Sequence, residues 1–410
     1  MTLDSIDLTD LDFFATGDVE GAFALIRATD PIHWQEKRPG RGFWSLTRFE
    51  DLLTVYRDAQ TFISGRGVTL HFGSGEEVSG LDKSMIMTDP PRHAKMRQVL
   101  SRRFTPRAVA PFADRIRGIA RTIVDDVVDR GECDFVTEVA ARLPTAAICD
   151  LMGIGREHWD LMFAITNETI GRHDQEYARG RSGLETVRDA HARAAQFFTD
   201  LAAERRRNPG DDLVSSLVNG AMGGEPLTEA EIVANSYILI LGGQETTRNA
   251  ISGAMLAMIQ NPAELAKYKA DTFAVPAIEE FLRWTSPITN IMRIATRDTA
   301  IQGETIRAGD RVVLWNLAAN RDPAQFNDPQ RFDVTRTPND HVAFGYGEHF
   351  CLGANLARLE MRIMLNEVTT RMRDIELAGP IERLRSNTVA GIKRMPVRFQ
   401  PAASSHAALQ

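Results

Sequence analysis

One long helical pattern near the middle of the chain constrains the fold more than any other feature. Thr228 and Glu231 have the spacing of a capping box, which marks where a helix begins. The pattern then runs to about Ile259, and Asn261-Pro262 ends it. A helix of about 32 residues is about 48 Å long, far longer than an average globular helix. We therefore expect it to cross the whole molecule and to be buried in its middle.

Composition fits a large globular protein without a membrane anchor. Of the 410 residues, 43% are hydrophobic and 25% charged, and the net charge of -7 gives no reason to expect nucleic acid as a partner. The acidic N-terminus is unlike a secretory signal, and the most apolar stretch, 232–243, is too short to span a bilayer. Three cysteines are too few for a disulfide framework and suit a reducing cytosol, so we expect a cytoplasmic protein. Strand signals cluster at 33–48 and 301–316.

One cysteine stands in a glycine-rich loop. Residues 344–353 read FGYGEHFCLG, and a good helical pattern follows directly. Glycines at 345 and 347 permit a tight turn that places Cys351 at a helix N-terminus, where backbone N–H groups stabilise a thiolate. This environment suits a metal ligand. From these residues alone, a buried structural cysteine or a nucleophile with a histidine base remain alternatives.

The loop resembles the haem-binding loop of the cytochrome P450 family. The resemblance implies haem b as the cofactor and assigns its iron to Cys351, whose thiolate donates electron density for O–O cleavage. Phe344, His349 and Gly353 are implied to contact the haem, with His349 bonded to a propionate.

The same resemblance implies the fold. We expect a mainly α fold with small β-sheets, in which the haem lies between the long central helix and the helix after the cysteine loop. One domain is expected over 1–400, followed by a disordered tail over 401–410. The implied strands lie at about 30–65, 290–320 and 385–400.

A second pair of residues fits the same family. Glu280 and Arg283 stand three apart on an expected helix and so face the same side. An ordinary solvated ion pair is the alternative. The family's Glu-x-x-Arg signature matches them, and the resemblance makes Arg331 the third member of a structural cluster.

Further matches concern the haem propionates. His93 and Arg97 lie four apart on one helical face, and Arg293 lies in an expected strand. By resemblance, these three residues and His349 bind the two carboxylates.

Two glycines interrupt the long helix. Gly242 and Gly243 each cost about 1 kcal/mol relative to alanine, so a flat cofactor or substrate is expected to approach there. The resemblance makes the adjacent Glu245 and Thr246 the catalytic pair that delivers protons during dioxygen activation. As an alternative, Thr246 bonds the carbonyl four residues earlier.

The resemblance also implies redox partners. A soluble bacterial-type member, expected to be a monomer, would take NAD(P)H-derived electrons from a ferredoxin and its reductase. Residues 89–107 carry six basic residues and one acidic residue, a net of +5. Lys95, Arg102, Arg103 and Arg107 are candidates for ferredoxin docking, with a plain solvated face as the alternative.

We expect an apolar substrate of the terpenoid, steroid or polyketide class, oxidised with O2. A peroxide-driven peroxygenase and a haem-binding protein without catalysis are the rival functions. The candidate substrate contacts are Val68, Leu70, Phe72, Met85, Ile238, Leu241, Gly242, Thr289, Ile291 and Val389.

Overall fold

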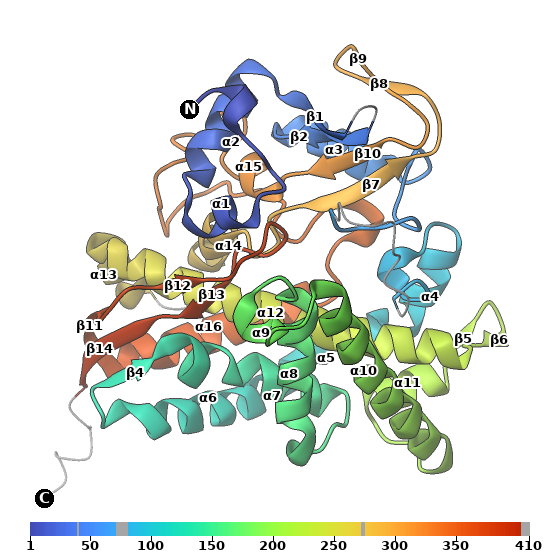
Figure 1. Cartoon of the computed structure of the whole chain (residues 1–410). Coiled ribbons are helices and arrows are strands. Elements are labelled where there is room, and N and C mark those ends of the chain that lie inside the picture. Colours follow the sequence, from blue (N-terminus) through green and yellow to red (C-terminus); the bar gives the residue numbers. More distant parts are fainter. Residues whose placement is uncertain (39–40, 71–80, 272–274, 403–410) are drawn as a thin grey trace, which may run out of the picture.

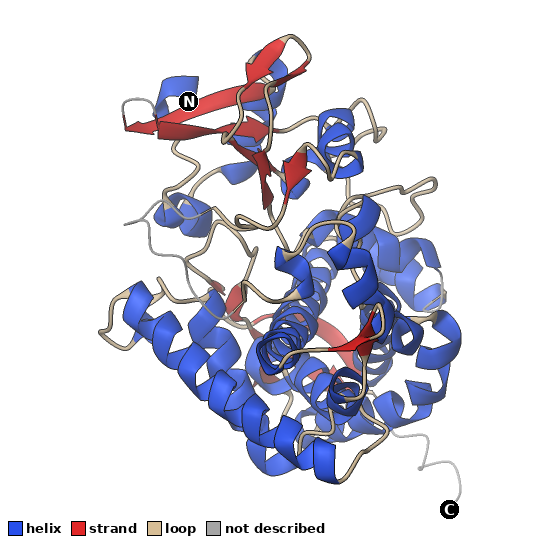
Figure 2. Ribbon diagram, turned by 90° about the vertical axis from the view of Figure 1, so that its right-hand side faces the viewer, coloured by secondary structure: helices blue, strands red, loops and turns tan. Residues whose placement is uncertain are grey.

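The computed structural model describes residues 1–38, 41–70, 81–271 and 275–402. Phe72 and the expected tail from 403 onward lie outside the described residues. A smaller part contains the N-terminal helices and the largest sheet, and a larger part consists mainly of helices (Figures 1 and 2). The mainly α fold with small sheets is confirmed.

Helices make up most of the structure. They are α1 (Leu11–Thr16), α2 (Val19–Thr29), α3 (Phe49–Arg57), α4 (Arg92–Ser101), α5 (Pro106–Val109), α6 (Ala113–Val128), α7 (Arg142–Leu151), α8 (Trp159–Ile170), α9 (Gln175–Ala178), α10 (Gly183–Arg207), α11 (Leu213–Val218), α12 (Glu229–Gln260), α13 (Pro262–Ala270), α14 (Val275–Thr285), α15 (Asn316–Ala319) and α16 (Ala354–Arg371).

The strands are short and form several small sheets. They are β1 (Ile32–Arg38), β2 (Arg41–Leu46), β3 (Phe62–Ile63), β4 (Glu132–Asp134), β5 (Ala221–Met222), β6 (Glu225–Pro226), β7 (Ile291–Ala295), β8 (Thr299–Ile301), β9 (Glu304–Ile306), β10 (Arg311–Leu314), β11 (Met372–Leu377), β12 (Glu382–Arg383), β13 (Ile392–Arg394) and β14 (Pro396–Pro401). The largest sheet has the order β1-β2-β10-β7-β3, so strands from the two segments predicted at 33–48 and 301–316 pair with each other.

The central helix α12 begins and ends close to the predicted positions. Thr228 Oγ1 accepts a bond from the Glu231 amide at 3.3 Å, and the Glu231 carboxylate accepts one from the Thr228 amide at 2.8 Å. Buried side chains lie all around the helix, among them Tyr237, Leu241 and Met255. It packs against α7, α10, α14 and α16, as expected of a helix through the middle of the molecule. None of the described helices is long and apolar enough to cross a membrane.

Candidate active site

The cysteine loop is a tight turn that glycine makes possible. Gly345 and Gly347 have φ values of 68° and 70°, which residues with a side chain rarely adopt. A Cβ at Gly347 would also lie 2.7 Å from the carbonyl oxygen of Tyr56. The Cys351 amide donates to the Phe344 carbonyl at 2.9 Å, which closes the loop just before α16. The cysteine is thereby held at a fixed place beside the start of this helix.

Two opposing effects act on the pKa of the Cys351 thiol. Burial raises its pKa, while a bond from the Gly353 amide and the positive charges of Arg97 and Arg358 favour the thiolate. A metal cation bound to the sulfur would add the stabilisation that burial removes. The environment therefore fits a cysteinate metal ligand better than a free nucleophile, which needs a lowered thiol pKa.

Arg358 on α16 is a site residue that the sequence did not reveal. Its guanidinium carbon lies 4.6 Å from the ring centre of Phe344, and its nitrogens donate to both carboxylate oxygens of Glu279 at 2.7 and 2.8 Å. Burial would raise the pKa of Glu279, but bonds from Arg358 and His341 lower it to about 2. The ion pair holds α16 and the Phe344 ring against α14. Arg358 and Glu279 are 79 residues apart, so no local spacing could have predicted the contact.

The predicted propionate ligands come together from three different segments. The rings of His93 and His349 lie 4.0 Å apart between their centres, although one is on α4 and the other in the cysteine loop. Ser64 Oγ lies 3.2 Å from His349 Nε2. Arg293 on β7 and Arg97 on α4 lie close enough to lower the pKa of His349, which burial and these charges bring to about 2.

The guanidinium groups of Arg97 and Arg293 in this cluster form no ion pair with a carboxylate among the described residues. Arg293 is 5% exposed, and its guanidinium donates to the Met292 carbonyl at 2.8 Å. Within the described part of the chain, no carboxylate lies within 4.0 Å of a nitrogen of Arg97 or Arg293. Burial lowers the pKa of both guanidinium groups, and His93 Nδ1 is buried without a partner in the same part of the chain. Such a cluster fits an anionic group with two carboxylates.

The central helix presents a bare face at the two glycines. Gly242 is exposed, whereas the residues around it on the helix are buried or half-buried, and a Cβ built there would meet nothing within 4 Å. A Cβ at Gly243 would instead lie 2.9 Å from the Ile148 side chain on α7. Of the two glycines, Gly242 therefore faces open space. Together with Cys351 and the cationic cluster, this bare face fits a flat, dianionic, iron-containing cofactor such as haem.

The predicted catalytic pair lies next to this bare face. Thr246 Oγ1 donates to the Gly242 carbonyl at 2.6 Å, so the back-bond considered as an alternative is present. Glu245 is 1% exposed and is bonded to Arg248 and Asn249. Neither partner was predicted, although Arg248 and Asn249 stand three and four residues after Glu245, at the spacings that share a helix face.

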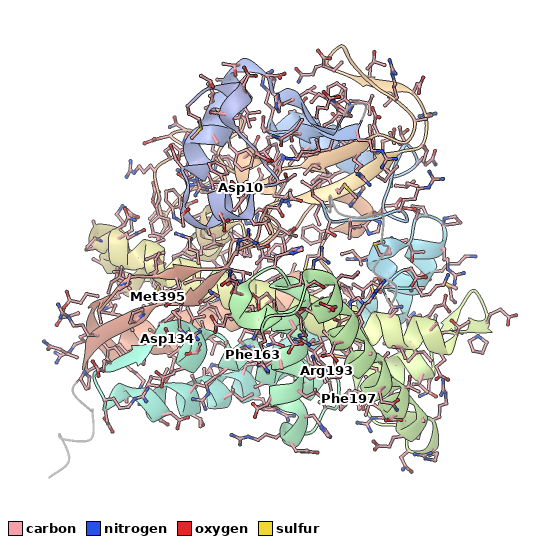
Figure 3. All side chains as sticks on the ribbon, viewed as in Figure 1. Asp10, Asp134, Phe163, Arg193, Phe197 and Met395 are labelled. Atoms are coloured by element: carbon pink, nitrogen blue, oxygen red, sulfur yellow. The ribbon has the colours of Figure 1, made fainter. Side chains whose placement is uncertain are left out.

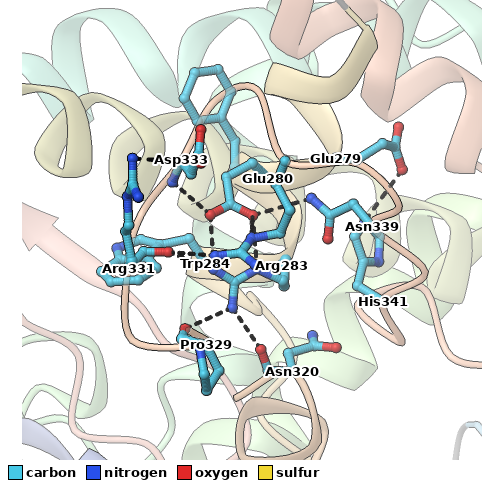
Figure 4. A network of polar contacts seen from close by, with 12 residues as sticks. Glu279, Glu280, Arg283, Trp284, Asn320, Pro329, Arg331, Asp333, Asn339 and His341 are labelled. Carbon is cyan, nitrogen blue, oxygen red and sulfur yellow. Dashed lines mark hydrogen bonds and ion pairs between the residues drawn. The ribbon is translucent and has the colours of Figure 1, made fainter. Parts of the chain in front are cut away.

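The predicted structural cluster is present, with one correction. Arg283 Nε and Nη2 each donate to the Glu280 carboxylate at 2.7 Å, and both side chains are 0% exposed (Figure 4). The prediction that Arg331 supplies the third side chain is wrong. Its guanidinium is 58% exposed, and its carbonyl takes part instead, accepting from Arg283 at 3.2 Å. Arg336 Nε lies 3.2 Å from the Glu280 carboxylate, because the chain turns back between the two arginines.

The candidate substrate residues differ in how they are placed. The buried ones are Val68, Leu70, Met85, Leu241 and Val389, and the half-buried ones are Ile238 and Ile291. Leu70 packs in the N-terminal core with Phe23 and Trp315. Thr289 is 1% exposed, and its hydroxyl donates to the Asn387 carbonyl. The contacts of these residues with a ligand stay a prediction.

Comparison with known proteins agrees with this geometry. The sequence model of the cytochrome P450 family matches residues 272–373. A methyl-branched lipid omega-hydroxylase of Mycobacterium bovis is 38% identical over 96% of this chain and 94% of its own. A steroid C26-monooxygenase of Mycolicibacterium smegmatis is 35% identical over 98% of both chains.

A solved structure extends the match to three dimensions. Mycobacterium marinum cytochrome P450 CYP268A2, in complex with pseudoionone, superposes with a TM-score of 0.91 at 35% identity, covering 97% of this chain and 99% of that one. The glycine-rich cysteine loop, the buried Glu-x-x-Arg cluster and these matches over nearly the whole length lead to one conclusion: the chain belongs to the cytochrome P450 family.

Proposed function

We propose that this cytochrome P450 monooxygenase hydroxylates an extended apolar molecule of the terpenoid or steroid class, with a polyketide as the remaining candidate. We further propose that it works in the cytoplasm with haem b, O2 and NAD(P)H-derived electrons from a ferredoxin and its reductase. Relatives named as a methyl-branched lipid omega-hydroxylase and a steroid C26-monooxygenase support this substrate class.

The observation that supports the substrate class is the apolar character of the candidate substrate contacts. Met85, Ile238, Leu241 and Ile291 are all apolar. The polar candidate Thr289 already donates its hydroxyl hydrogen to a backbone carbonyl. Burial of apolar surface would therefore supply most of the binding free energy, and few of these candidates could pair with a charged ligand.

The residues present define how the cofactor would be held. Cys351 would ligate the iron. The residues that would bind the propionates are Arg97, Arg293, His93 and His349. Haem held in this way would supply the activation of O2 with two electrons. Phe344 and the bare positions Gly242 and Gly353 would pack against the ring, because a Cβ at either glycine would meet no protein atom within 4 Å.

Thr246 and Glu245 would handle the protons. Thr246 Oγ1 donates to the Gly242 carbonyl, so its lone pairs remain available to accept a hydrogen bond from a ligand at the bare face. Glu245 Oε2 is buried and has no hydrogen-bond partner within the described residues, so it could accept a proton. Proton transfer by positioned groups of this kind contributes typically about 10²–10⁴-fold to a rate.

The role of Cys351 is tested by the absorption difference spectrum of the reduced protein with carbon monoxide, which reports thiolate ligation. We expect Cys351→Ala to abolish the thiolate signal. Cys149→Ala is the matched control, because Cys149 is also buried but lies on α7, away from the loop. An unchanged spectrum in Cys351→Ala would contradict the assignment.

The substrate class is tested by ligand binding, followed through the spin-state shift of the haem. A panel should include a steroid, a branched-chain lipid, a polyketide lactone and a dianionic compound of similar size. We expect saturable shifts with the apolar members and none with the dianion. Tight binding of the dianion, without a shift from any apolar compound, would refute the substrate class.

Electron delivery would occur at the surface beside the cysteine loop. Tyr346 and Phe350 in this loop are 41% and 38% exposed. The exposed basic residues of the nearby segment 89–107 include Lys95, Arg102 and Arg107. Arg103 is less available, because it pairs with Asp211 at 2.5 Å. A surface of this kind would suit an acidic ferredoxin.

We therefore expect the double variant Arg102→Glu/Arg107→Glu to slow ferredoxin-driven turnover while sparing peroxide-driven turnover. Arg307→Glu, an exposed charge in the turn after β9, is the control. Equal losses of ferredoxin-driven and peroxide-driven turnover would contradict the docking surface. Full activity with peroxide and none with a ferredoxin in the parent enzyme would favour a peroxygenase instead.

A further inference from the structure

The carboxylate of Glu245 is held by two neighbours on its own helix. Arg248 Nη2 donates to Glu245 Oε1, and Asn249 Nδ2 donates to the same oxygen at 3.0 Å. Glu245, Arg248 and Asn249 are 1%, 2% and 1% exposed, so water does not replace these bonds. One carboxylate oxygen is therefore saturated, while Oε2 has no partner within the described residues.

Each of these neighbours also reaches a different part of the molecule. Arg248 Nη1 donates to Asn167 Oδ1 on α8 at 2.8 Å, and its guanidinium carbon lies 6.0 Å from the ring centre of Phe163 on the same helix. Phe163 is labelled in Figure 3, in the region where α8 passes the central helix. Asn249 Oδ1 accepts from the Ile392 amide of β13 at 3.2 Å. The carboxylate is thus linked to α8 and to β13 through one side chain each.

Ion pairs also join these two outer segments to each other. Asp174 and Glu176, in the segment that follows α8, lie 3.1 and 3.2 Å from Lys393 Nζ of β13. Glu176 also pairs with Arg394 at 2.7 Å. Contacts therefore join α12 to α8, α12 to β13, and the α8–α9 segment to β13.

A buried carboxylate needs such support. Removing a buried anion from water is costly unless a cation and hydrogen bonds compensate for it, and Arg248 is the cation bonded to Glu245. Because Arg248 and Asn249 both bind Oε1, they leave Oε2 free for proton exchange. A helix interior does not otherwise fix a flexible glutamate side chain in one orientation.

We propose that Arg248 is a positioning residue, which fixes the orientation of the Glu245 carboxylate and, through Asn167, makes that orientation depend on the position of α8. The proposal rests on the proposed role of Glu245 in proton delivery. A ligand that changes how α8 lies over the central helix would, by this link, also change the placement of the proton-handling group.

A thermal unfolding cycle tests the buried pair without reference to turnover. We expect Arg248→Met to lower the Tm by about 5 °C or more, because it leaves Glu245 without its cation. The double variant Glu245→Gln/Arg248→Met should regain at least half of that loss, because the unpaired charge is gone. If Arg248→Met does not accumulate as folded protein, recovery of folded protein in the double variant is the readout. A double variant no better than Arg248→Met would overturn the proposal.

A second experiment tests the link to α8 in the holoenzyme. Asn167→Leu removes the acceptor for Arg248 but keeps the Glu245–Arg248 pair. The control Arg193→Met removes a different contact of α8, because Arg193 pairs with Glu168 of that helix. We expect Asn167→Leu to lower the product formed per NAD(P)H consumed by about threefold, with ligand affinity by the spin-state shift within about twofold of the parent, and Arg193→Met to leave both unchanged.

Glu245→Gln separates the two ways in which the proposal can fail. If it leaves the product yield unchanged, the proposed proton role of Glu245 is refuted, whatever the unfolding cycle shows. If it lowers the yield while Asn167→Leu does not, the link through α8 is refuted and the proton role stands. A lower yield in Asn167→Leu that is accompanied by an equal loss in Arg193→Met would show general loosening of α8, and would also refute the link.

Discussion

Two glutamate–arginine pairs among the described residues are buried and have the same spacing, but they are built differently. In the Glu280–Arg283 pair of α14, both carboxylate oxygens have several donors, among them the Asp333 amide at 2.9 Å. Arg283 also donates to two backbone carbonyls of the segment 320–329 at 2.8 and 2.9 Å. In the Glu245–Arg248 pair of α12, Glu245 Oε2 and Arg248 Nε have no hydrogen-bond partner within the described residues.

The difference shows that spacing and burial do not determine what such a pair does. The Glu280–Arg283 pair is itself saturated, in part by backbone groups from 320 to 333, so it fixes the path of a segment that has little regular structure (Figure 4). The Glu245 pair bonds mainly to side chains and keeps one oxygen free. A carboxylate with donors on both oxygens is held in one position. A carboxylate with one unpaired oxygen beside a bare helix face can exchange a proton.

The largest expected effect comes from opening the saturated network. Arg283→Met leaves Glu280 buried without its main cation, so the free energy of unfolding should fall by about 3–5 kcal/mol. Urea unfolding of the parent and the variant measures it. Arg398→Met, at a pair that is 63% and 57% exposed, is the control and should leave the free energy of unfolding unchanged, because solvent screens an exposed pair. If Arg283→Met lost less unfolding free energy than Arg248→Met, the Glu245–Arg248 pair would be the more important of the two for stability, contrary to this comparison.

The next effect concerns Glu279, the neighbour of Glu280 on α14, which pairs with Arg358 of α16. Because Arg358 and His341 bring its pKa from 4.5 to about 2, the folded state binds a proton there less readily than the unfolded state. Its stabilisation is therefore complete above about pH 4.5 and is lost as the pH falls through about 2, and it amounts to roughly 3 kcal/mol.

Unfolding free energies of the parent and of Glu279→Gln between about pH 5 and pH 2.5 test this sign. The difference between the two proteins should shrink steadily as the pH falls through that range. A difference that stays constant would mean that Glu279 has an ordinary pKa in the folded protein.

A smaller effect distinguishes the two arginines of the segment before the cysteine loop. Arg336 is 9% exposed, approaches Glu280, and donates to the carbonyls of Asn327 and Arg331 at 2.6 and 2.9 Å. Arg336→Met should therefore cost about 1–3 kcal/mol, whereas Arg331→Met should stay within about 0.5 kcal/mol. Chemical denaturation of both variants checks the order. Equal losses would restore Arg331 as the third member of the saturated network.

These residues also show how far the sequence could predict the structure. The bounds of α12, the turn around Cys351 and the Glu280–Arg283 pair follow from local spacing, because a helix repeat or a capping box joins residues three or four apart. Arg248 could have been found in the same way, from its distance to Glu245 along the helix.

Contacts between distant segments were beyond the reach of local spacing. The meeting of His93, Arg293 and His349 followed only from the family resemblance, because the three come from a helix, a strand and a loop. Arg336 was missed because its segment has no periodicity, so nothing local shows which arginine turns inward.

The smallest effect distinguishes the two glycines beside the unsaturated pair. Gly243→Ala would place a Cβ against Ile148, so it should lose about 1–3 kcal/mol, and the loss should be smaller when Ile148 is already alanine. Gly242→Ala meets nothing and replaces a poor helix former, so the protein without haem should gain up to about 1 kcal/mol. Unfolding of the haem-free protein measures both. A loss in Gly242→Ala would mean that protein atoms fill the space there, and the helix face beside Glu245 would then be as closed as the surroundings of Glu280.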